Sequence, residues 1–312
     1  MHDLMILGGG PAGLTAAMYA IQKRLDAVLV TRDLGGKTRY QLRLPFIERH
    51  MMINGDEVIS RFVREIEYLD YLHVADNAES VEKIDGGYAV RLTSGKVHET
   101  HPIIIATGAK PELLNVPGEQ EFLNRGLCYS AISYAQFFID RSAAVVGDGD
   151  LALRAVAELA RHAKHVTLVA ETEGQIHSPL GQKLWGLPHV EFMVGYRVKE
   201  VRGDHYAHTE IITRDGEEKP KELEVDAIFI EKDLTPRSKI VAHLCALDEQ
   251  GRVKVDERNQ TSAPGIFAAG DVANSCSEQV LISLGEGAKA ALSAFEYLLK
   301  TEDLSLPNPA SA

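Results

Sequence analysis

The sequence predicts an α/β protein of two domains, and three observations lead to that prediction. Two glycine-rich loops, at 8–13 and 147–152, each follow a short apolar run and precede a stretch with helical spacing. Between about 80 and 99, and again before 230, apolar and polar residues alternate as they do in β-meanders. The chain of 312 residues is long enough for two domains of ordinary size.

The first part of the chain predicts a βαβ unit followed by a meander. In order, we expect a strand at 4–7, a helix at 11–23, a strand at 27–30, a helix from 55, a meander over 80–99 and a strand at 102–106. Two prolines and a glycine within 109–119 then indicate a linker between domains.

The second part repeats this order. We expect a strand at 143–146, a helix at 150–162, a strand at 166–169, alternating strands to 230, a crossover at 236–247, a strand at 265–271 and a helix at 278–300. This order predicts two Rossmann-like, three-layer domains with β-meanders, the second inserted into the first.

Composition excludes several classes of function. The net charge is -12 and no basic stripe is interleaved with aromatic residues, so we expect no nucleic-acid partner. No apolar run reaches the ~20 residues of a membrane helix, and the N-terminus has no basic signal region. We therefore expect a cytoplasmic protein. The cysteines Cys128, Cys245 and Cys276 are far apart, which favours buried, inert thiols and no metal site.

The first glycine loop has the pattern that binds a dinucleotide. Gly8 permits a tight turn, Gly10 lets the backbone approach a pyrophosphate, and Gly13 lets helix and strand pack closely. Pro11 suits the first helical turn, whose free N–H groups attract phosphate. Thr31 is our candidate for the ribose hydroxyls, because the expected acid, Asp33, comes slightly late.

Further segments resemble one flavoprotein family. Residues 105–109 read I-A-T-G-A, 265–272 read G-I-F-A-A-G-D-V, and Glu278-Gln279-Val280 precedes a G-E-G. Together with Gly35-Gly36, they make the chain similar to the low-molecular-weight thioredoxin reductases among the pyridine nucleotide-disulfide oxidoreductases. The resemblance covers nearly the whole chain. It implies bound FAD, a homodimer, an FAD domain at 1–112 and 245–312, and an NAD(P)-type domain at 113–244.

The resemblance also implies particular flavin contacts. The aspartate of the G-x-F-A-A-G-D segment, here Asp271, contacts the ribityl chain, and the start of the last helix lies by the pyrimidine end. Loop and resemblance together assign FAD binding to Gly8, Gly10, Pro11, Ala12, Gly13, Thr31, Gly36, Lys37, Ala106, Thr107, Gly108, Gly270, Asp271, Gln279 and Val280.

The redox dithiol of that family is absent. Its C-x-x-C positions fall on Ser130 and Ser133, and a hydroxyl has no accessible disulfide couple. Cys128 lies two residues upstream and has no neighbouring thiol, so it is a weak candidate for lone-thiol chemistry; a buried small residue is the simpler interpretation.

The second glycine loop is altered. Gly147, Gly149 and Ala152 keep the pattern that shapes the fold. We expect Asp148 and Asp150 to repel a pyrophosphate as unpaired carboxylates, unless one of them caps the helix.

The basic cluster that pairs with a 2′-phosphate in NADPH-using relatives is also missing. No Lys or Arg occurs from 165 to 182, and Glu171 follows the second strand, where an acid can hold a ribose diol. NADPH is therefore disfavoured, which leaves NADH or no nicotinamide nucleotide. The charged segment 229–236 and the segment 44–47 depart from the family pattern as well.

These observations favour an FAD-dependent oxidoreductase that does not reduce thioredoxin with NADPH. Electrons would reach the flavin from NADH or from a ferredoxin-like protein, as in ferredoxin–NAD(P) reductases that also lack the cysteine pair. Two alternatives stay open: a flavin-bound sensor or interaction protein with a vestigial second site, and thiol chemistry through Cys128.

Overall fold

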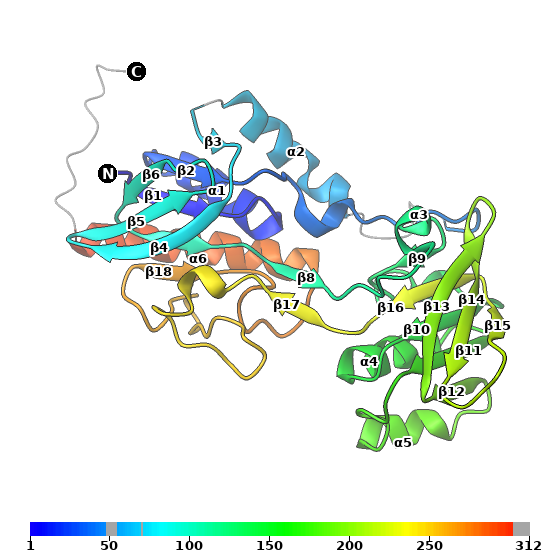
Figure 1. Ribbon diagram of the computed structural model, residues 1–312. Helices are drawn as coiled ribbons and strands as arrows, with labels where there is room; N and C mark the ends of the chain where they lie inside the picture. Colours follow the sequence, from blue (N-terminus) through cyan, green and yellow to red (C-terminus); the bar gives the residue numbers. More distant parts are fainter. Residues whose placement is uncertain (48–54, 70, 302–312) are drawn as a thin grey trace. The chain divides into compact units, whose positions relative to one another are not determined.

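The computed structural model describes residues 1–47, 55–69 and 71–301. The chain forms two compact units, coloured by sequence in Figure 1. Unit 1 comprises 1–39, 55–110 and 235–312, and unit 2 comprises 40–54 and 111–234. The predicted domain boundaries differ from these units over 40–54, 111–112 and 235–244.

Unit 1 is built on a five-stranded parallel sheet with the strand order β18-β7-β1-β2-β3. Its strands are β1 (Leu4–Leu7), β2 (Ala27–Val30), β3 (His73–Val74), β7 (Ile103–Ile105) and β18 (Ile266–Ala268). Its helices are α1 (Pro11–Gln22), α2 (Gly55–Tyr68) and α6 (Val280–Thr301). The first glycine loop joins β1, the central strand, to α1.

The side chains of β1 show how unit 1 is layered. Leu4 and Ile6 are buried against α1, α2 and α6. Met5 and Leu7 are buried on the opposite face, against an antiparallel meander. The meander consists of β4 (Ala78–Ile84), β5 (Gly87–Leu92) and β6 (Val97–Thr100). This alternation along one strand produces the predicted three layers.

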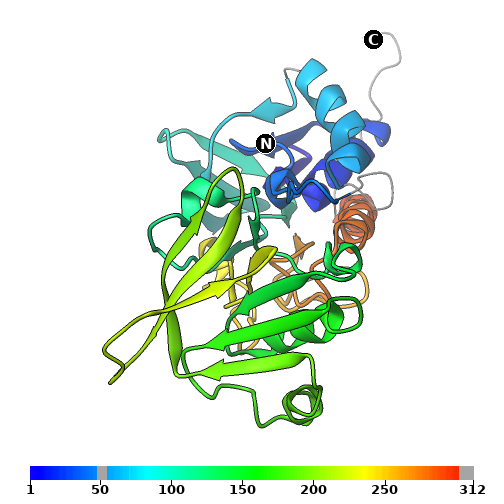
Figure 2. The ribbon, with the colours of Figure 1, turned by 90° about the vertical axis from the view of Figure 1, so that its right-hand side faces the viewer.

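Unit 2 repeats the layering on a second parallel sheet, with the order β12-β11-β10-β16-β9 (Figure 2). Its strands are β9 (Leu127–Cys128), β10 (Ser142–Val146), β11 (His165–Ala170), β12 (Val190–Val194) and β16 (Ala227–Ile230). On one face lie α4 (Asp150–Leu159) and α5 (Pro179–Trp185). On the other lies the meander β13 (Tyr196–Gly203), β14 (Ala207–Arg214) and β15 (Lys221–Glu224).

Two sequence predictions for the connections were incomplete. The predicted linker contains β8 (Ala109–Pro111) and α3 (Glu119–Phe122), and β8 pairs with β17 (Leu234–Pro236). The chain passes between the units in β8 and β17. The predicted crossover at 236–247 contains a single 3-10 turn, η4 (Lys239–Val241). Two further 3-10 turns are η1 (Gly36–Arg39) and η3 (Ala135–Phe137).

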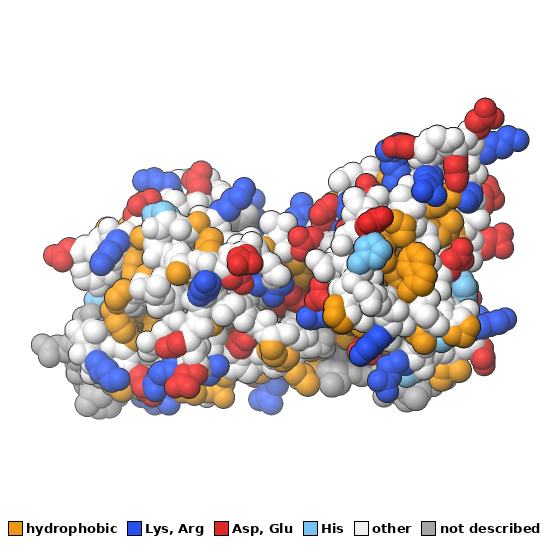
Figure 3. Space-filling view, turned by 90° about the horizontal axis from the view of Figure 1, so that it is seen from below, with side chains coloured by type: hydrophobic (Ala, Val, Ile, Leu, Met, Phe, Trp, Pro, Cys, Tyr) orange, Lys and Arg blue, Asp and Glu red, His pale blue; other side chains and the backbone are white. Residues whose placement is uncertain are grey.

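On the face drawn in Figure 3, Lys and Arg side chains are interspersed with Asp and Glu, without a broad basic patch. Among the described residues, no helix is long and apolar enough to span a membrane.

Candidate flavin and nucleotide sites

Two glycines of the first loop are required by close packing. Gly8 has φ +114, and a Cβ on it would stand 2.2 Å from the carbonyl oxygen of Ala106. A Cβ on Gly13 would stand 1.8 Å from the carbonyl oxygen of Gly8. Side chains at these positions would collide with backbone, so the loop can close only with glycine there.

Gly10 is different, because it opens onto free space. It is the N-cap residue of α1, with Pro11 at the first helical position, and no atom lies within 4 Å of where its Cβ would stand. The helix N-terminus therefore has room for a bulky anion beside its free N–H groups. The loop fits the pyrophosphate of FAD.

Segments far apart in sequence surround this loop. The Gly35 N–H donates to the Gly9 carbonyl oxygen over 2.7 Å, and a Cβ on Gly36 would stand 3.2 Å from the Gly10 Cα. Lys37 forms an ion pair with Asp271, with 2.6 Å between Nζ and Oδ2. The structure thus brings these predicted flavin residues together within unit 1.

The remaining predicted contacts lie at the ends of β7, β18 and α6. The Ala106 N–H donates to the Leu7 carbonyl oxygen, and the Thr107 hydroxyl donates to the Arg237 carbonyl oxygen. Gly108 and Gly270 both have positive φ, of +69 and +75. Val280 begins α6, and Gln279 directly precedes it. Their contacts with flavin stay predictions.

Thr31 is poorly placed for its predicted role. Its hydroxyl donates to the Asp33 carbonyl oxygen over 2.9 Å and accepts from the Asp33 N–H over 3.1 Å. The Asp33 carboxylate itself pairs with Arg39 at 3.3 Å. A ribose bond from Thr31 would have to replace this local turn, so the geometry gives that role no support.

The second glycine loop keeps the same backbone shape. Gly147 has φ +153, and a Cβ on it would stand 2.3 Å from the Glu231 carbonyl oxygen. Gly149 is the N-cap residue of α4, and the nearest atom to its hypothetical Cβ is the Lys232 carbonyl oxygen at 3.7 Å. Ala152 is fully buried in the first helical turn. This loop also fits a pyrophosphate.

The prediction of unpaired carboxylates at this loop was wrong. Asp148 accepts a hydrogen bond from the Thr172 hydroxyl at 2.5 Å, and Asp150 forms an ion pair with Arg154 at 2.8 Å. Neither side chain caps α4. Only Asp150 has a counter-ion, since the Thr172 hydroxyl is neutral, so the negative charge of Asp148 still faces the loop.

A cation at this loop was missed by the sequence analysis. The Lys232 Nζ lies 2.7 Å from Glu112 and 3.8 Å from Glu171. Burial lowers the pKa of Lys232, but Glu112 and Glu171 raise it by more, so the pKa is above its ordinary value and the ammonium is charged. Three residues so far apart share no local pattern, so only the folded chain reveals this cluster.

The two serines at the family's cysteine positions lie side by side. Their Oγ atoms are 2.9 Å apart and share a hydrogen bond. Between them, the Ala131 N–H donates to Glu231 Oε1 over 2.6 Å, and the Glu231 side chain is buried. The motif therefore keeps a compact turn while carrying hydroxyls where a dithiol would lie.

Cys128 lies in β9 within the core of unit 2. Burial raises the pKa of its thiol to about 12. Such a thiol is almost entirely protonated at neutral pH and therefore a poor nucleophile. Cys245 is also buried, whereas Cys276 is exposed, so the expectation of a buried thiol was wrong for Cys276. Within the described residues, no group of acidic, His and Cys side chains could hold a metal ion.

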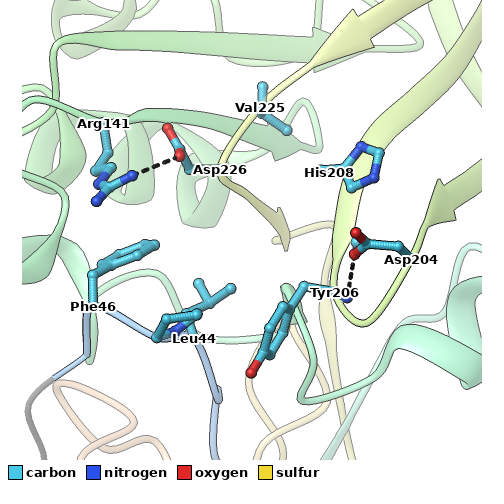
Figure 4. A pocket seen from close by; sticks show the side chains of 10 residues that line it. Leu44, Phe46, Arg141, Asp204, Tyr206, His208, Val225 and Asp226 are labelled. Carbon is cyan, nitrogen blue, oxygen red and sulfur yellow. Dashed lines mark hydrogen bonds and ion pairs between the residues drawn. The ribbon is translucent and has the colours of Figure 1, made fainter.

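Unit 2 also has an open pocket of about 470 Å³ whose lining includes Phe46 and Tyr206 (Figure 4). Its charged groups are already paired: Arg141 with Asp226 at 3.2 Å, and Asp204 with the Tyr206 N–H. None of its lining residues belongs to a glycine loop.

Two parallel-sheet units with dinucleotide-type glycine loops define a flavoprotein oxidoreductase of the two-dinucleotide class. The family model described as pyridine nucleotide-disulphide oxidoreductase matches residues 2–291. The chain belongs to this family. The match confirms the predicted class of enzyme, a thioredoxin reductase-like FAD-dependent oxidoreductase, and the family implies FAD and a pyridine nucleotide.

Curated relatives are longer than this chain. The F component of alkyl hydroperoxide reductase of Pseudomonas aeruginosa is 33% identical over 309 residues, covering 96% of this chain and 58% of that protein. The same component of Staphylococcus epidermidis is 34% identical over 304 residues, with 59% of its length covered. The chain thus spans less than two thirds of these relatives.

Among solved structures, thioredoxin reductase from Streptococcus pyogenes superimposes with a TM-score of 0.87 at 29% identity. The alignment covers 96% of this chain and 99% of that one. Thioredoxin reductase from Giardia duodenalis, with a TM-score of 0.85 at 23% identity, shares the fold. The three cysteines of the chain are all unpaired, so it has the family fold without a close cysteine pair.

Proposed function

We propose that this protein is an FAD-dependent NADH oxidoreductase that passes electrons from the flavin to an acceptor without an internal dithiol. One observation carries the proposal: the Ser130 and Ser133 hydroxyls lie 2.9 Å apart where the family has its redox cysteines. Serine cannot cycle between dithiol and disulfide. Electrons must therefore leave the flavin for an external acceptor.

Unit 1 is proposed as the flavin domain. When bound there, FAD supplies two-electron and one-electron chemistry. The open Gly10 and the N-terminus of α1 would hold its pyrophosphate, as the free space at Gly10 supports. The Lys37–Asp271 pair would lie along the ribityl side by the family resemblance.

Unit 2 is proposed as the NADH domain. The backbone at Gly147 and Gly149 supports a pyrophosphate site. Glu171 at the end of β11 suits a ribose diol, and no Lys or Arg occurs from 165 to 182 to hold a 2′-phosphate. NADH is therefore the proposed donor in preference to NADPH.

The test is anaerobic mixing of the purified, flavin-loaded protein with NADH, NADPH or reduced ferredoxin, followed by loss of flavin absorbance. We expect rapid bleaching by NADH and at least about tenfold slower bleaching by NADPH. Bleaching by ferredoxin alone would replace NADH by a protein donor. A flavin that no donor bleaches would overturn the proposed enzyme and favour a sensor.

The acceptor is tested separately. With NADH supplied, we expect negligible reduction of thioredoxin, because the dithiol relay is missing. Quinones, oxygen and an organic peroxide complete the panel; the peroxide is included because the curated relatives are named as parts of alkyl hydroperoxide reductase. Turnover that disappears in Cys128→Ser would instead assign the reaction to that thiol.

The family resemblance also supports a homodimer as the proposed assembly. Light scattering coupled to size exclusion measures the mass directly. A mass close to the 34.2 kDa of one chain would contradict it.

A further inference from the structure

We propose that Lys232 is the phosphate-binding cation of the second glycine loop, that Glu112 positions it, and that Glu171 releases it when the nucleotide binds. This inference rests on the proposed NADH site and deepens it, because it assigns the pyrophosphate and the ribose to different side chains. Glu171 would then select a ribose diol over a 2′-phosphate.

The residue before Lys232, Glu231, is held in place by hydrogen bonds from both its backbone and its side chain. The Glu231 N–H donates to the Val146 carbonyl oxygen over 2.8 Å, at the end of β10. Its carboxylate accepts from the Ala131 N–H over 2.6 Å. Lys232 therefore leaves a rigid point of the backbone, and its own carbonyl oxygen is the atom closest to the open side of Gly149.

The balance of charge around the loop requires a cation. Asp148 and Asp150 lie within the loop, and Glu171 and Glu173 follow β11. Arg154 is already paired with Asp150 along α4. A pyrophosphate with two negative charges would meet a net acidic rim without Lys232, whose side chain is 26% exposed and so reaches solvent.

The two carboxylate partners of Lys232 are unequal. Glu112 lies at 2.7 Å, whereas Glu171 lies at 3.8 Å and is about half exposed. A phosphate oxygen would displace the weaker contact and leave the stronger one in place. The Glu171 carboxylate, directly after the last residue of β11, would then be free to accept hydrogen bonds from two ribose hydroxyls.

A 2′-phosphate would reverse this advantage. It would bring a second anion against Glu171 instead of a hydrogen-bond donor, and Lys232 would already be engaged by the pyrophosphate. Like charges at contact distance in a partly exposed site are strongly unfavourable. The same cluster that accepts NADH would therefore disfavour NADPH.

The experiment is isothermal titration of the flavin-loaded protein with ADP-ribose, 2′-phospho-ADP-ribose and adenosine, so that binding is read without turnover. Lys232→Met should weaken ADP-ribose binding about tenfold and leave adenosine binding within about twofold. Lys232→Arg should restore most of the loss. Lys199→Met, an exposed lysine of β13, is the matched control and should change nothing.

The carboxylates give independent readouts. Glu171→Gln should reduce the preference for ADP-ribose over its 2′-phosphate about tenfold, because the repelling charge is gone. Glu112→Gln should weaken ADP-ribose binding about threefold through a less well positioned Lys232.

Lys232→Met that binds ADP-ribose as tightly as the wild type, or more tightly, would overturn the inference while leaving the NADH site standing. A wild-type protein that binds no ADP-ribose would overturn the proposed NADH site and the inference with it. The flavin-bleaching test distinguishes these two failures.

Discussion

In unit 1, α1 begins at an open glycine beside the Lys37–Asp271 pair, and the loop is closed by Gly8 and Gly13. In unit 2, α4 begins at Gly149, where the nearest atom is the Lys232 carbonyl oxygen at 3.7 Å, and the Lys232 ammonium lies between Glu112 and Glu171. Both loops keep the backbone of a pyrophosphate cradle. The first loop lies in the unit proposed to bind the flavin, whereas the second lacks the basic cluster of NADPH-using relatives and has one lysine between two glutamates.

This difference shows that the shape of a loop and the nucleotide it binds are determined by different residues. Glycines shape the loop through steric limits on the backbone, and those limits are the same in both units. The nucleotide that binds is decided by side chains contributed from other segments. Glu112, Glu171 and Lys232 come from three such segments, so the second site can change its ligand without any change of fold.

The largest expected effect comes from adding a side chain at the N-cap glycine of each loop, Gly10 or Gly149. Gly10 has φ -73, which any residue adopts, and open space around it, so Gly10→Val should fold and yet block the pyrophosphate. We expect flavin content to fall at least about tenfold. Flavin absorbance per protein measures the loss, and circular dichroism verifies the fold.

The matched variant is Gly149→Val, where the nearest atom lies at ordinary contact distance, 3.7 Å. It should keep its flavin and lose ADP-ribose binding. If Gly149→Val also lost flavin, or if Gly10→Val kept it, the assignment of one nucleotide to each unit would be wrong.

The second effect is a restored dithiol in unit 2. In Ser130→Cys/Ser133→Cys, two thiols would replace hydroxyls that already lie 2.9 Å apart on a compact turn. We expect them to form a disulfide under mild oxidation, so that titratable thiols decrease by two on oxidation and return with dithiothreitol. Each single variant is the control and should show no such change.

Two cysteines that stay reduced under these conditions would show that the turn no longer has the geometry of the family's motif. Thioredoxin reduction by the double variant is a further readout, and we expect it to rise above the wild-type level.

The fold was largely predictable, because strands, glycine loops and amphipathic helices are local patterns. The three layers of unit 1 and of unit 2 follow from alternation along β1 and β10. The absence of a dithiol was also predictable, because the spacing of the family motif identifies Ser130 and Ser133 as the positions of the two cysteines. The confirmed family and enzyme class rest on these same patterns.

The side-chain contacts around the two glycine loops were less predictable than the fold. Asp148 looked unpaired because its partner, Thr172, comes from the end of another strand. Segment 44–47 departs from the family pattern, and its place in unit 2, where the Leu42 N–H just before it donates to the buried Tyr134 hydroxyl, was not readable from the sequence. Such contacts depend on the packing of distant segments, which a single sequence does not encode locally.

The third expected effect concerns a difference in the buried residues of the two meanders. In unit 1, Val81 and Val90 face the sheet and are fully buried. In unit 2, Glu210 lies opposite the buried Val201 in the β13–β14 ladder, and both its carboxylate oxygens lack a hydrogen-bond partner within the described residues. Burial raises the pKa of Glu210 to about 8.

The sign of the pH dependence follows from that shift. In the unfolded chain Glu210 ionises near the ordinary glutamate pKa of 4.5, whereas in the fold it holds its proton until about pH 8. Stability of unit 2 is therefore greatest below the unfolded pKa, falls as pH rises between these values, and levels off above them. Glu210→Leu should remove this slope and stabilise unit 2 by roughly 3 kcal/mol near pH 9.

Urea unfolding followed by tryptophan fluorescence measures this, because the single tryptophan, Trp185, lies in unit 2. Val90→Leu in the other meander is the control and should leave the pH dependence unchanged. Equal slopes in wild type and Glu210→Leu would show that Glu210 reaches solvent in the folded protein.

The smallest effect concerns the ion pair of unit 1. The Lys37 and Asp271 side chains are 34% and 12% exposed, so solvent screens their attraction in part. We expect Lys37→Met to lower the urea midpoint for flavin release by the equivalent of about 1 kcal/mol. Flavin fluorescence, which increases on release, reports this transition.

A double-mutant cycle with Asp271→Asn separates the pair from direct flavin contacts. If Lys37 acts through Asp271, the double variant should lose little more than the stronger single variant. Additive losses would mean that each side chain contacts the flavin independently. In that case unit 1, like unit 2, would hold its nucleotide by charged side chains as well as by its backbone, and the contrast between the two loops would be one of degree.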